Sequence, residues 1–262
     1  MSTADFRETF DLKFLLFCMI STSIMFWGMW GICRLVMKDR SSVAEFVQAC
    51  YRASLAVNGM ALVESISGNT SMGGMMMLGT VPLYNIYAVI LLQSESPDRD
   101  NTQDQGRMKS TLLGIAKNPI IISILAGFLF SLTGIKYPAI IETTLRYIGR
   151  IGTPFALLCI GADFDFKKAF GKIGKSGLAS AFKLVFFPVI FTSAAILLGF
   201  RGEKLVSILV SLAAPTTPVS FIMAKKYGHD GTITSSAVAL TTLFSSLTMA
   251  VFIFILKTLQ LI

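Results

Sequence analysis

Runs of mostly apolar residues recur along the 262-residue chain, and each approaches the roughly 20 residues that a helix needs to cross a bilayer. Short polar segments separate these runs, except for the longer polar stretch "QSESPDRDNTQDQGRMKS" at Gln93 to Ser110. The pattern predicts an all-α polytopic membrane protein with about eight crossings. We expect the helices at residues 12–36, 44–66, 72–93, 118–135, 142–163, 176–199, 204–226 and 231–259.

The composition agrees with a membrane protein. Hydrophobic residues make up 53% of the chain and charged residues only 15%, whereas about 25% of a soluble domain is charged. The net charge of +8 is assigned to loops that orient the chain in the membrane, with no nucleic acid as a partner. The four cysteines contain no C-x-x-C pair and are expected to pack in the helices, without disulfides, a metal site or a cofactor: Cys18, Cys33, Cys50 and Cys159.

Lysine and arginine concentrate in the loops after the first, third, fifth and seventh expected helices. Because basic loops favour the cytoplasmic side, we expect a multi-pass protein of the cell (plasma) membrane with both termini on the outer side. The loop 93–117 is expected in the cytoplasm. The start "MSTADFRETF" has no basic segment followed by an apolar one. No ordinary signal peptide is therefore predicted.

Two of the expected helices are interrupted by residues that disfavour a helix. The stretch "SLAAPTTPVSFIMAKKYG" contains Pro215 and Pro218, and a proline in a helix interior costs about 3 kcal/mol. The stretch "YRASLAVNGMALVESISGN", at Tyr51 to Asn69, has small polar residues in its middle. These are the second and seventh helices, so an odd number of crossings separates them and inverts one copy relative to the other. Inverted repeats with interrupted helices at matching positions indicate the binding site of a secondary transporter.

The two copies differ in the number of helices that precede the interruption. Residues 118–262 are expected to form a complete second repeat of five helices, and residues 1–92 an incomplete first repeat of about three, with the loop 93–117 between them. We therefore predict that two N-terminal helices are missing, through truncation, a misplaced start codon or a natural deletion.

Four motifs resemble the auxin efflux carrier family, which includes bacterial permeases and the plant PIN-FORMED exporters: "AAPTTPVSFIMAKKYG", the preceding "LVSLAA", "PLYN" at Pro82 to Asn85, and "TPFALLCIGADF" at Thr153 to Phe164. The resemblance covers roughly residues 12–260. It implies an inverted-repeat transporter fold of five plus five helices, related to bile-acid symporters and sodium–proton antiporters. It also implies two broken helices that cross at mid-membrane and an organic anion as substrate.

The resemblance places Pro215 on the family's crossover proline and Thr216 on the polar residue beside it. The plant proteins have Pro-Asn in the first repeat where this chain has Ala53 and Ser54. Two half-helices that begin at mid-membrane aim unpaired N–H groups and positive dipole ends at an anion. The expected site residues are Ser54, Asn58, Pro215, Thr216, Thr217, Pro218 and Ser220.

Several other polar residues have two interpretations each. Arg52 either attracts an entering anion or extends its side chain to the interface. Asn85 either lines the substrate path or bonds across helices. Lys183 is expected to extend to the interface, His229 to be a solvated loop residue in "YGHDG", and Asp163 to cap a turn.

The function that these features favour is alternating-access transport of a small organic anion, such as a mono- or dicarboxylate. The alternatives are an H⁺- or Na⁺-coupled antiporter or symporter of related fold, and an inactive truncated fragment. Coupling to H⁺ or Na⁺ and a homodimer are left open. No Walker A motif is present, and an intramembrane aspartyl enzyme needs a second aspartate near Asp163. The chain is therefore not expected to be an enzyme.

Overall fold

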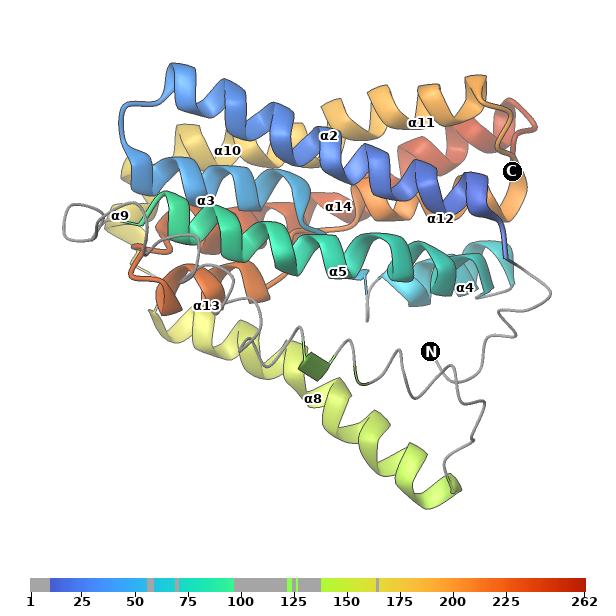
Figure 1. Cartoon of the computed structure of the whole chain (residues 1–262), viewed down its shortest axis with the longest axis horizontal. Coiled ribbons are helices and arrows are strands. Elements are labelled where there is room, and N and C mark those ends of the chain that lie inside the picture. Colours follow the sequence, from blue (N-terminus) through green and yellow to red (C-terminus); the bar gives the residue numbers. More distant parts are fainter. Residues whose placement is uncertain are drawn as a thin grey trace.

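The computed structural model describes residues 10–55, 59–68, 71–96, 122–123, 126, 138–163 and 165–262. Every regular element within these residues is helical, which confirms the all-α prediction (Figure 1). Residues 97–117 of the expected loop and most of the expected helix at 118–135 lie outside the described residues.

Four helices match the expected spans closely. The first begins where the side chain of Asp11 accepts a hydrogen bond of 3.0 Å from the backbone N–H of Phe14, an N-cap that the sequence signals by an aspartate before an apolar run. The four helices are α2 (Leu12–Val36), α5 (Ser71–Ser94), α8 (Ala139–Asp163) and α14 (Thr232–Thr258).

The helix expected at 176–199 begins earlier than predicted. It follows the short α9 (Phe166–Gly171) and consists of α10 (Ile173–Ala181), the π-helical turn η3 (Phe182–Phe186) and α11 (Phe187–Leu197). At 1.5 Å per residue, Lys183 lies about 15 Å from the first residue of α10. This lysine is therefore deeper in the bundle than the sequence pattern indicated.

The two interrupted helices are broken where the sequence predicts. One consists of α3 (Arg40–Tyr51) and α4 (Met60–Ser67), and the other of α12 (Gly202–Ala213) and α13 (Val219–Lys226). Ala214 is extended, with φ −62° and ψ 148°, because a residue that precedes a proline is disfavoured in the helical region. The break in the first helix has no proline and begins at Arg52, which has φ −78° and ψ 138°.

The helices pack as a bundle in which α2 and α5 lie side by side (Figure 1). The rings of Phe26 on α2 and Tyr87 on α5 stack with their centroids 4.4 Å apart. Tyr51 at the end of α3 packs against both Phe26 and Tyr84. The broken helix α3 is thus held inside the bundle, whereas α8 lies apart from it and contacts α13 near one end.

The outer faces of the bundle are apolar. Four stretches among the described residues are long and apolar enough to cross a membrane: Leu12–Val36, Ser71–Ser94, Ile173–Leu197 and Thr232–Thr258. Large apolar side chains such as Ile20 and Trp27 on α2 and Leu247 and Phe254 on α14 are more than half exposed. Contiguous apolar surface of this kind is unfavourable in water and suits contact with lipid. The chain is a polytopic membrane protein.

Candidate functional site

The two breaks meet inside the bundle. The backbone N–H of Ser54 donates to the carbonyl of Pro215 over 2.8 Å, which joins the break after α3 to the break after α12. The hydroxyl of Thr216 donates to the carbonyl of Ala49 over 2.8 Å, a carbonyl left free because α3 ends two residues later. The N–H of Thr216 in turn donates to Oγ1 of Thr241 on α14 over 3.0 Å. Each break therefore supplies partners for backbone groups that the other leaves free.

The structure brings Ser54, Pro215 and Thr216 together at this crossing. Thr216 is 1% exposed and Ser220 is fully buried, and Oγ of Ser220 has no hydrogen-bond partner among the described residues. The half-buried Thr217 accepts a hydrogen bond from the N–H of Val219 at the start of α13, over 3.4 Å, and Pro218 is the N-cap residue. Asn58 lies outside the described residues.

Arg52 is buried at the crossing. Arg52 is 3% exposed, which excludes one of its two interpretations, the extension of its side chain to the interface. Its guanidinium donates to Oε1 of Gln48 over 3.1 Å and to Oδ1 of Asn85 over 3.2 Å. Asn85 therefore bonds across helices, as one of its two interpretations proposed, and its amide nitrogen donates to the carbonyl of Val81 in its own helix.

The charge of Arg52 has no acidic partner in the part of the chain that the structure describes. No ion pair there includes Arg52. Its Nε and Nε2 of Gln48 are both buried without a hydrogen-bond partner among the same residues. A buried guanidinium without a carboxylate is energetically unfavourable, so this cluster of donors has the chemistry of an anion site.

A second buried basic side chain, that of Lys183 in η3, faces the last turn of α12 before its break. Pro215 has no N–H, so the carbonyl of Ser211, four residues earlier, loses its helical donor. Nζ of Lys183 and the hydroxyl of Tyr84 both lie 3.5 Å from this carbonyl oxygen, at the outer limit of hydrogen-bond distance. Lys183 is fully buried, and the prediction that it extends to the interface is wrong because the helix begins earlier than expected.

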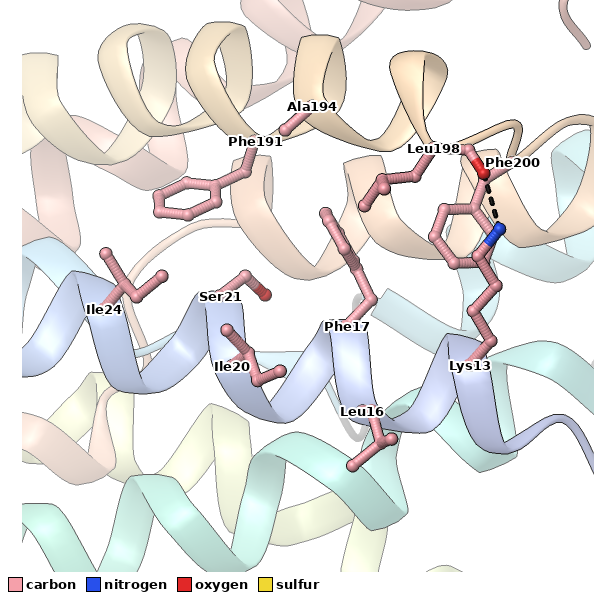
Figure 2. Close-up of a pocket in the computed structure, with 10 residues that line it drawn as sticks. All are labelled: Lys13, Leu16, Phe17, Ile20, Ser21, Ile24, Phe191, Ala194, Leu198 and Phe200. Atoms are coloured by element: carbon pink, nitrogen blue, oxygen red, sulfur yellow. Dashed lines mark hydrogen bonds between the residues drawn. The ribbon is translucent and has the colours of Figure 1, made fainter.

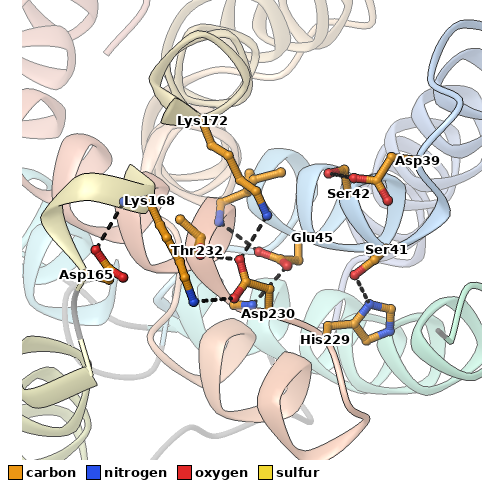
Figure 3. A network of polar contacts seen from close by, with 12 residues as sticks. Asp39, Ser41, Ser42, Glu45, Asp165, Lys168, Lys172, His229, Asp230 and Thr232 are labelled. Carbon is orange, nitrogen blue, oxygen red and sulfur yellow. Dashed lines mark hydrogen bonds and ion pairs between the residues drawn. The ribbon is translucent and has the colours of Figure 1, made fainter. Parts of the chain in front are cut away.

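Polar contacts join the broken helices to their neighbours at the end of the bundle where α3 begins (Figure 3). Glu45 on α3 is fully buried, and its carboxylate accepts hydrogen bonds from the backbone N–H groups of Gly231, Ile233 and Thr234 at the start of α14, over 2.9, 2.8 and 3.3 Å. Gly231 has φ +77°, a conformation that favours glycine. Sequence reasoning missed Glu45, although a carboxylate in an apolar helix was a signal that could have found it.

His229 is not a solvated loop residue, and that prediction is wrong. It is 3% exposed, its Nδ1 lies 3.2 Å from the hydroxyl of Ser41, and its Nε2 lies 3.1 Å from the carbonyl of Leu92. The turn before α14 packs against α3 and α5, which removes the imidazole from water. Asp163, expected to cap a turn, forms an ion pair of 2.7 Å with Lys225 on α13.

Asp230 forms ion pairs with two lysines at the same end, with Lys172 over 2.9 Å and with Lys168 over 3.7 Å (Figure 3). Partial burial opposes ionisation of Asp230, but the hydrogen bonds from Thr232 and Lys172 and the two lysine charges outweigh it and lower the pKa of Asp230 to about 2. Partial burial likewise opposes the charge of Lys172, but Asp230 and Glu45 raise the pKa of Lys172. These pairs tie α9 and α10 to the start of α14.

The lowered pKa of Asp230 predicts a pH dependence of stability. A carboxyl with a lowered pKa in the folded state stabilises the protein above its unfolded pKa of about 4, and this contribution is lost as the pH falls from about 4 to about 2. Because the Asp230 side chain is 35% exposed, we expect Asp230→Asn to cost about 1 kcal/mol at neutral pH and nothing near pH 2. Thermal unfolding of wild type and Asp230→Asn in detergent, from neutral pH to about pH 2, measures this difference in stability. Glu64→Gln, at an exposed position, is the control. An equal difference at every pH would contradict the prediction.

An apolar cavity of about 360 Å³ lies elsewhere, between α2 and α11 (Figure 2). Phe17, Ile20 and Phe191 line it, and Lys13 lies at one end with its Nζ 2.7 Å from the carbonyl of Leu198. None of its lining residues belongs to either break. The cavity is therefore separate from the candidate site at the crossing.

Comparison with known proteins identifies the family. The sequence profile of a family described as "Membrane transport protein" matches residues 1–253. Auxin efflux carrier component 3a of Oryza sativa subsp. japonica is 28% identical over 130 residues, 47% of this chain and 21% of its own length. Auxin efflux carrier component 2 of Arabidopsis thaliana is 29% identical over 130 residues, 47% of this chain and 20% of its own.

An archaeal relative is matched over a larger share of both chains. An uncharacterized transporter of Methanocaldococcus jannaschii is 24% identical over 155 residues, which are 58% of this chain and 50% of the relative. The aligned segments thus span between a fifth and a half of these relatives. The family profile covers nearly the whole chain, and the chain belongs to the auxin efflux carrier family of membrane transport proteins.

Proposed function

We propose that this chain transports a small organic anion, such as a mono- or dicarboxylate, by alternating access with the anion bound at the crossing of the two broken helices. The observation that carries the proposal is the buried guanidinium of Arg52, which has no carboxylate partner among the described residues. An arginine binds a carboxylate through paired hydrogen bonds. The family membership supports transport as the activity.

One half-helix end adds to this attraction. The helix α13 begins just after the second break, so its positive dipole end lies close to the crossing. Ser220, one residue into α13, offers a buried hydroxyl without a partner among the described residues. These groups stabilise negative charge without a metal ion or a further charged side chain.

An antiporter of H⁺ or Na⁺ would need a carboxylate at the crossing, and the buried acids that the structure describes are engaged elsewhere. Glu45 caps α14. Glu95 accepts from Nε1 of Trp30 over 2.8 Å and pairs with Arg34 over 2.7 Å. The described part of the crossing therefore favours an anion over a cation as the transported species.

The crossing is closed in this conformation, since Arg52, Thr216 and Ser220 are at most 3% exposed. An anion can reach these groups only after one bundle of helices moves against the other, as alternating access requires. Transport therefore depends on contacts that hold the two breaks together in one state and release them in another.

Counterflow in liposomes tests the proposal. The purified full chain is reconstituted, and exchange of labelled malonate, malate and indole acetate is measured beside the uncharged amide of each. We expect saturable exchange of at least one anion and of none of the amides. Thr216→Val, which removes the bond to Ala49, is expected to slow exchange about tenfold, since a buried hydrogen bond is worth about 1 kcal/mol or more when its partner is left unpaired.

Thr144→Val is the matched control, because Thr144 is exposed and its hydroxyl donates to the carbonyl of Ile140 in its own helix. Exchange no faster than in protein-free liposomes for every anion would contradict the proposal. Equal exchange in wild type and Thr216→Val would remove the crossing from the mechanism.

A further inference from the structure

Lys183 is a buried titratable side chain that the proposed anion site does not use. It lies in the π-helical turn η3, and its side chain is fully buried. Such turns inside an α-helix often occur at functional positions. A lysine with no access to water is costly unless its charge is compensated, so its neighbours determine which form it takes.

The neighbours of Lys183 offer little compensation in this conformation. Its one hydrogen-bond acceptor among the described residues is the carbonyl of Ser211 at 3.5 Å, while an ammonium group has three donors. Tyr84 shares that acceptor. Three donors facing one distant oxygen fit a neutral amine better than an ammonium ion.

The charged groups on the elements packed against η3 are engaged elsewhere or are cationic. The helices in contact with η3 are α3, α10, α11, α12 and α14. Their carboxylates are Glu45, held by α14, and Glu203, which accepts from the N–H of Met72 over 3.0 Å. The remaining titratable or charged side chains on these helices are Arg40, Cys50, Tyr51, Lys175, Lys204 and Lys257.

A short chain of contacts connects Lys183 to the crossing. The carbonyl of Ser211 that it faces is the one freed by Pro215. Tyr84, which faces the same carbonyl, directly precedes Asn85, and Asn85 holds the guanidinium of Arg52. Lys183 therefore faces the last turn of α12 before the crossing, at which the proposed anion binds.

We propose that Lys183 is the proton-coupling residue of the carrier, taking up one proton when a singly charged anion binds and releasing it with the anion. The inference rests on the proposed anion transport. Water on the open side donates a proton to the Nζ lone pair and forms the ammonium, which compensates the anion during the transition. On the other side the anion leaves and the ammonium returns the proton to water, so the amine crosses back neutral and each cycle moves one anion with one proton.

The test separates net accumulation from exchange. In liposomes loaded with buffer at one pH unit above the medium, we expect wild-type protein to accumulate a singly charged anion about tenfold, since one pH unit corresponds to a factor of 10. Lys183→Met and Lys183→Gln are expected to lose this accumulation while their counterflow exchange, which needs no net proton movement, is slower than in wild type but still faster than in protein-free liposomes. Lys257→Met, at an exposed position on α14, is the matched control and should behave as wild type.

The outcomes distinguish failure of the coupling role from failure of anion transport. Counterflow in wild type without accumulation in the pH gradient would overturn the role of Lys183 and leave anion transport intact. Accumulation in Lys183→Met equal to wild type would do the same. No counterflow in wild type would overturn both proposals.

A binding measurement covers the case in which neither variant folds. Calorimetry of anion binding to the wild-type protein, in buffers of different ionisation enthalpy, gives the number of protons bound with each anion. We expect about one proton per singly charged anion, and a value near zero would overturn the proposal.

Discussion

Replacing Arg52 by glutamine is expected to slow anion exchange about 100-fold, because truncating one partner of a buried charge interaction costs about 2–5 kcal/mol. The guanidinium is 3% exposed, and Gln48 and Asn85 hold it at the crossing. Glutamine keeps hydrogen-bond donors but removes the charge that would bind the carboxylate. Counterflow of the labelled anion in liposomes measures the effect.

Two further variants show whether the loss in Arg52→Gln comes from the charge at this position. Arg52→Lys keeps the charge without the planar pair of donors and should fall between wild type and Arg52→Gln. Arg40→Gln is the control, because Arg40 begins the same helix, is half exposed and lies 3.5 Å from Glu95, which also pairs with Arg34. Exchange in Arg52→Gln within twofold of wild type would show that the anion is not held at this guanidinium.

Hydropathy and proline were sufficient to predict most of the described fold. The apolar runs gave the spans of α2, α5 and α14 to within a residue or two at each end, because a membrane helix must satisfy its backbone hydrogen bonds internally. Pro215 and Pro218 located the second break, because a proline has no backbone N–H to donate within a helix. The division into repeats at 1–92 and 118–262 stays a prediction, as does the orientation of the termini.

The first break was harder to predict because it contains no proline. Internal similarity and the family resemblance predict Ser54, and the contact between its N–H and the carbonyl of Pro215 shows that the two breaks meet. That contact joins residues far apart in the sequence. No local pattern around Ser54 determines which carbonyl its N–H reaches.

The errors concern polar side chains whose surroundings depend on distant residues. Arg52 had two interpretations because its depth alone permits both, and the partner that holds it inside is Asn85 on another helix. A helix start at residue 176 puts Lys183 near a helix end, but the helix begins three residues earlier, at Ile173. A turn such as "YGHDG" predicts a solvated His229, but here the turn is covered by α3 and α5.

Replacing Glu45 by alanine is expected to lower the free energy of unfolding more than Asp230→Asn does. Its carboxylate is the acceptor for three backbone N–H groups at the first turn of α14, from Gly231 to Thr234. Alanine would leave these donors buried and unpaired, at about 1–3 kcal/mol for each such group. We expect a loss of about 3–5 kcal/mol and a fall in the yield of folded protein, measured by thermal unfolding and by size-exclusion chromatography in detergent.

Glu45→Gln removes the negative charge but keeps a hydrogen-bond acceptor, so it distinguishes the two contributions to stability. Its amide oxygen can still accept from one or two of the N–H groups, so its stability should lie between those of wild type and Glu45→Ala. Glu64→Ala is the matched control, because Glu64 is exposed on α4 and its side chain can stay in solvent. If Glu45→Ala unfolded at the same temperature as Glu64→Ala, the start of α14 would not depend on Glu45. The polar link between α3 and α14 would then come from Thr216, which bonds to Ala49 on α3 and to Thr241 on α14.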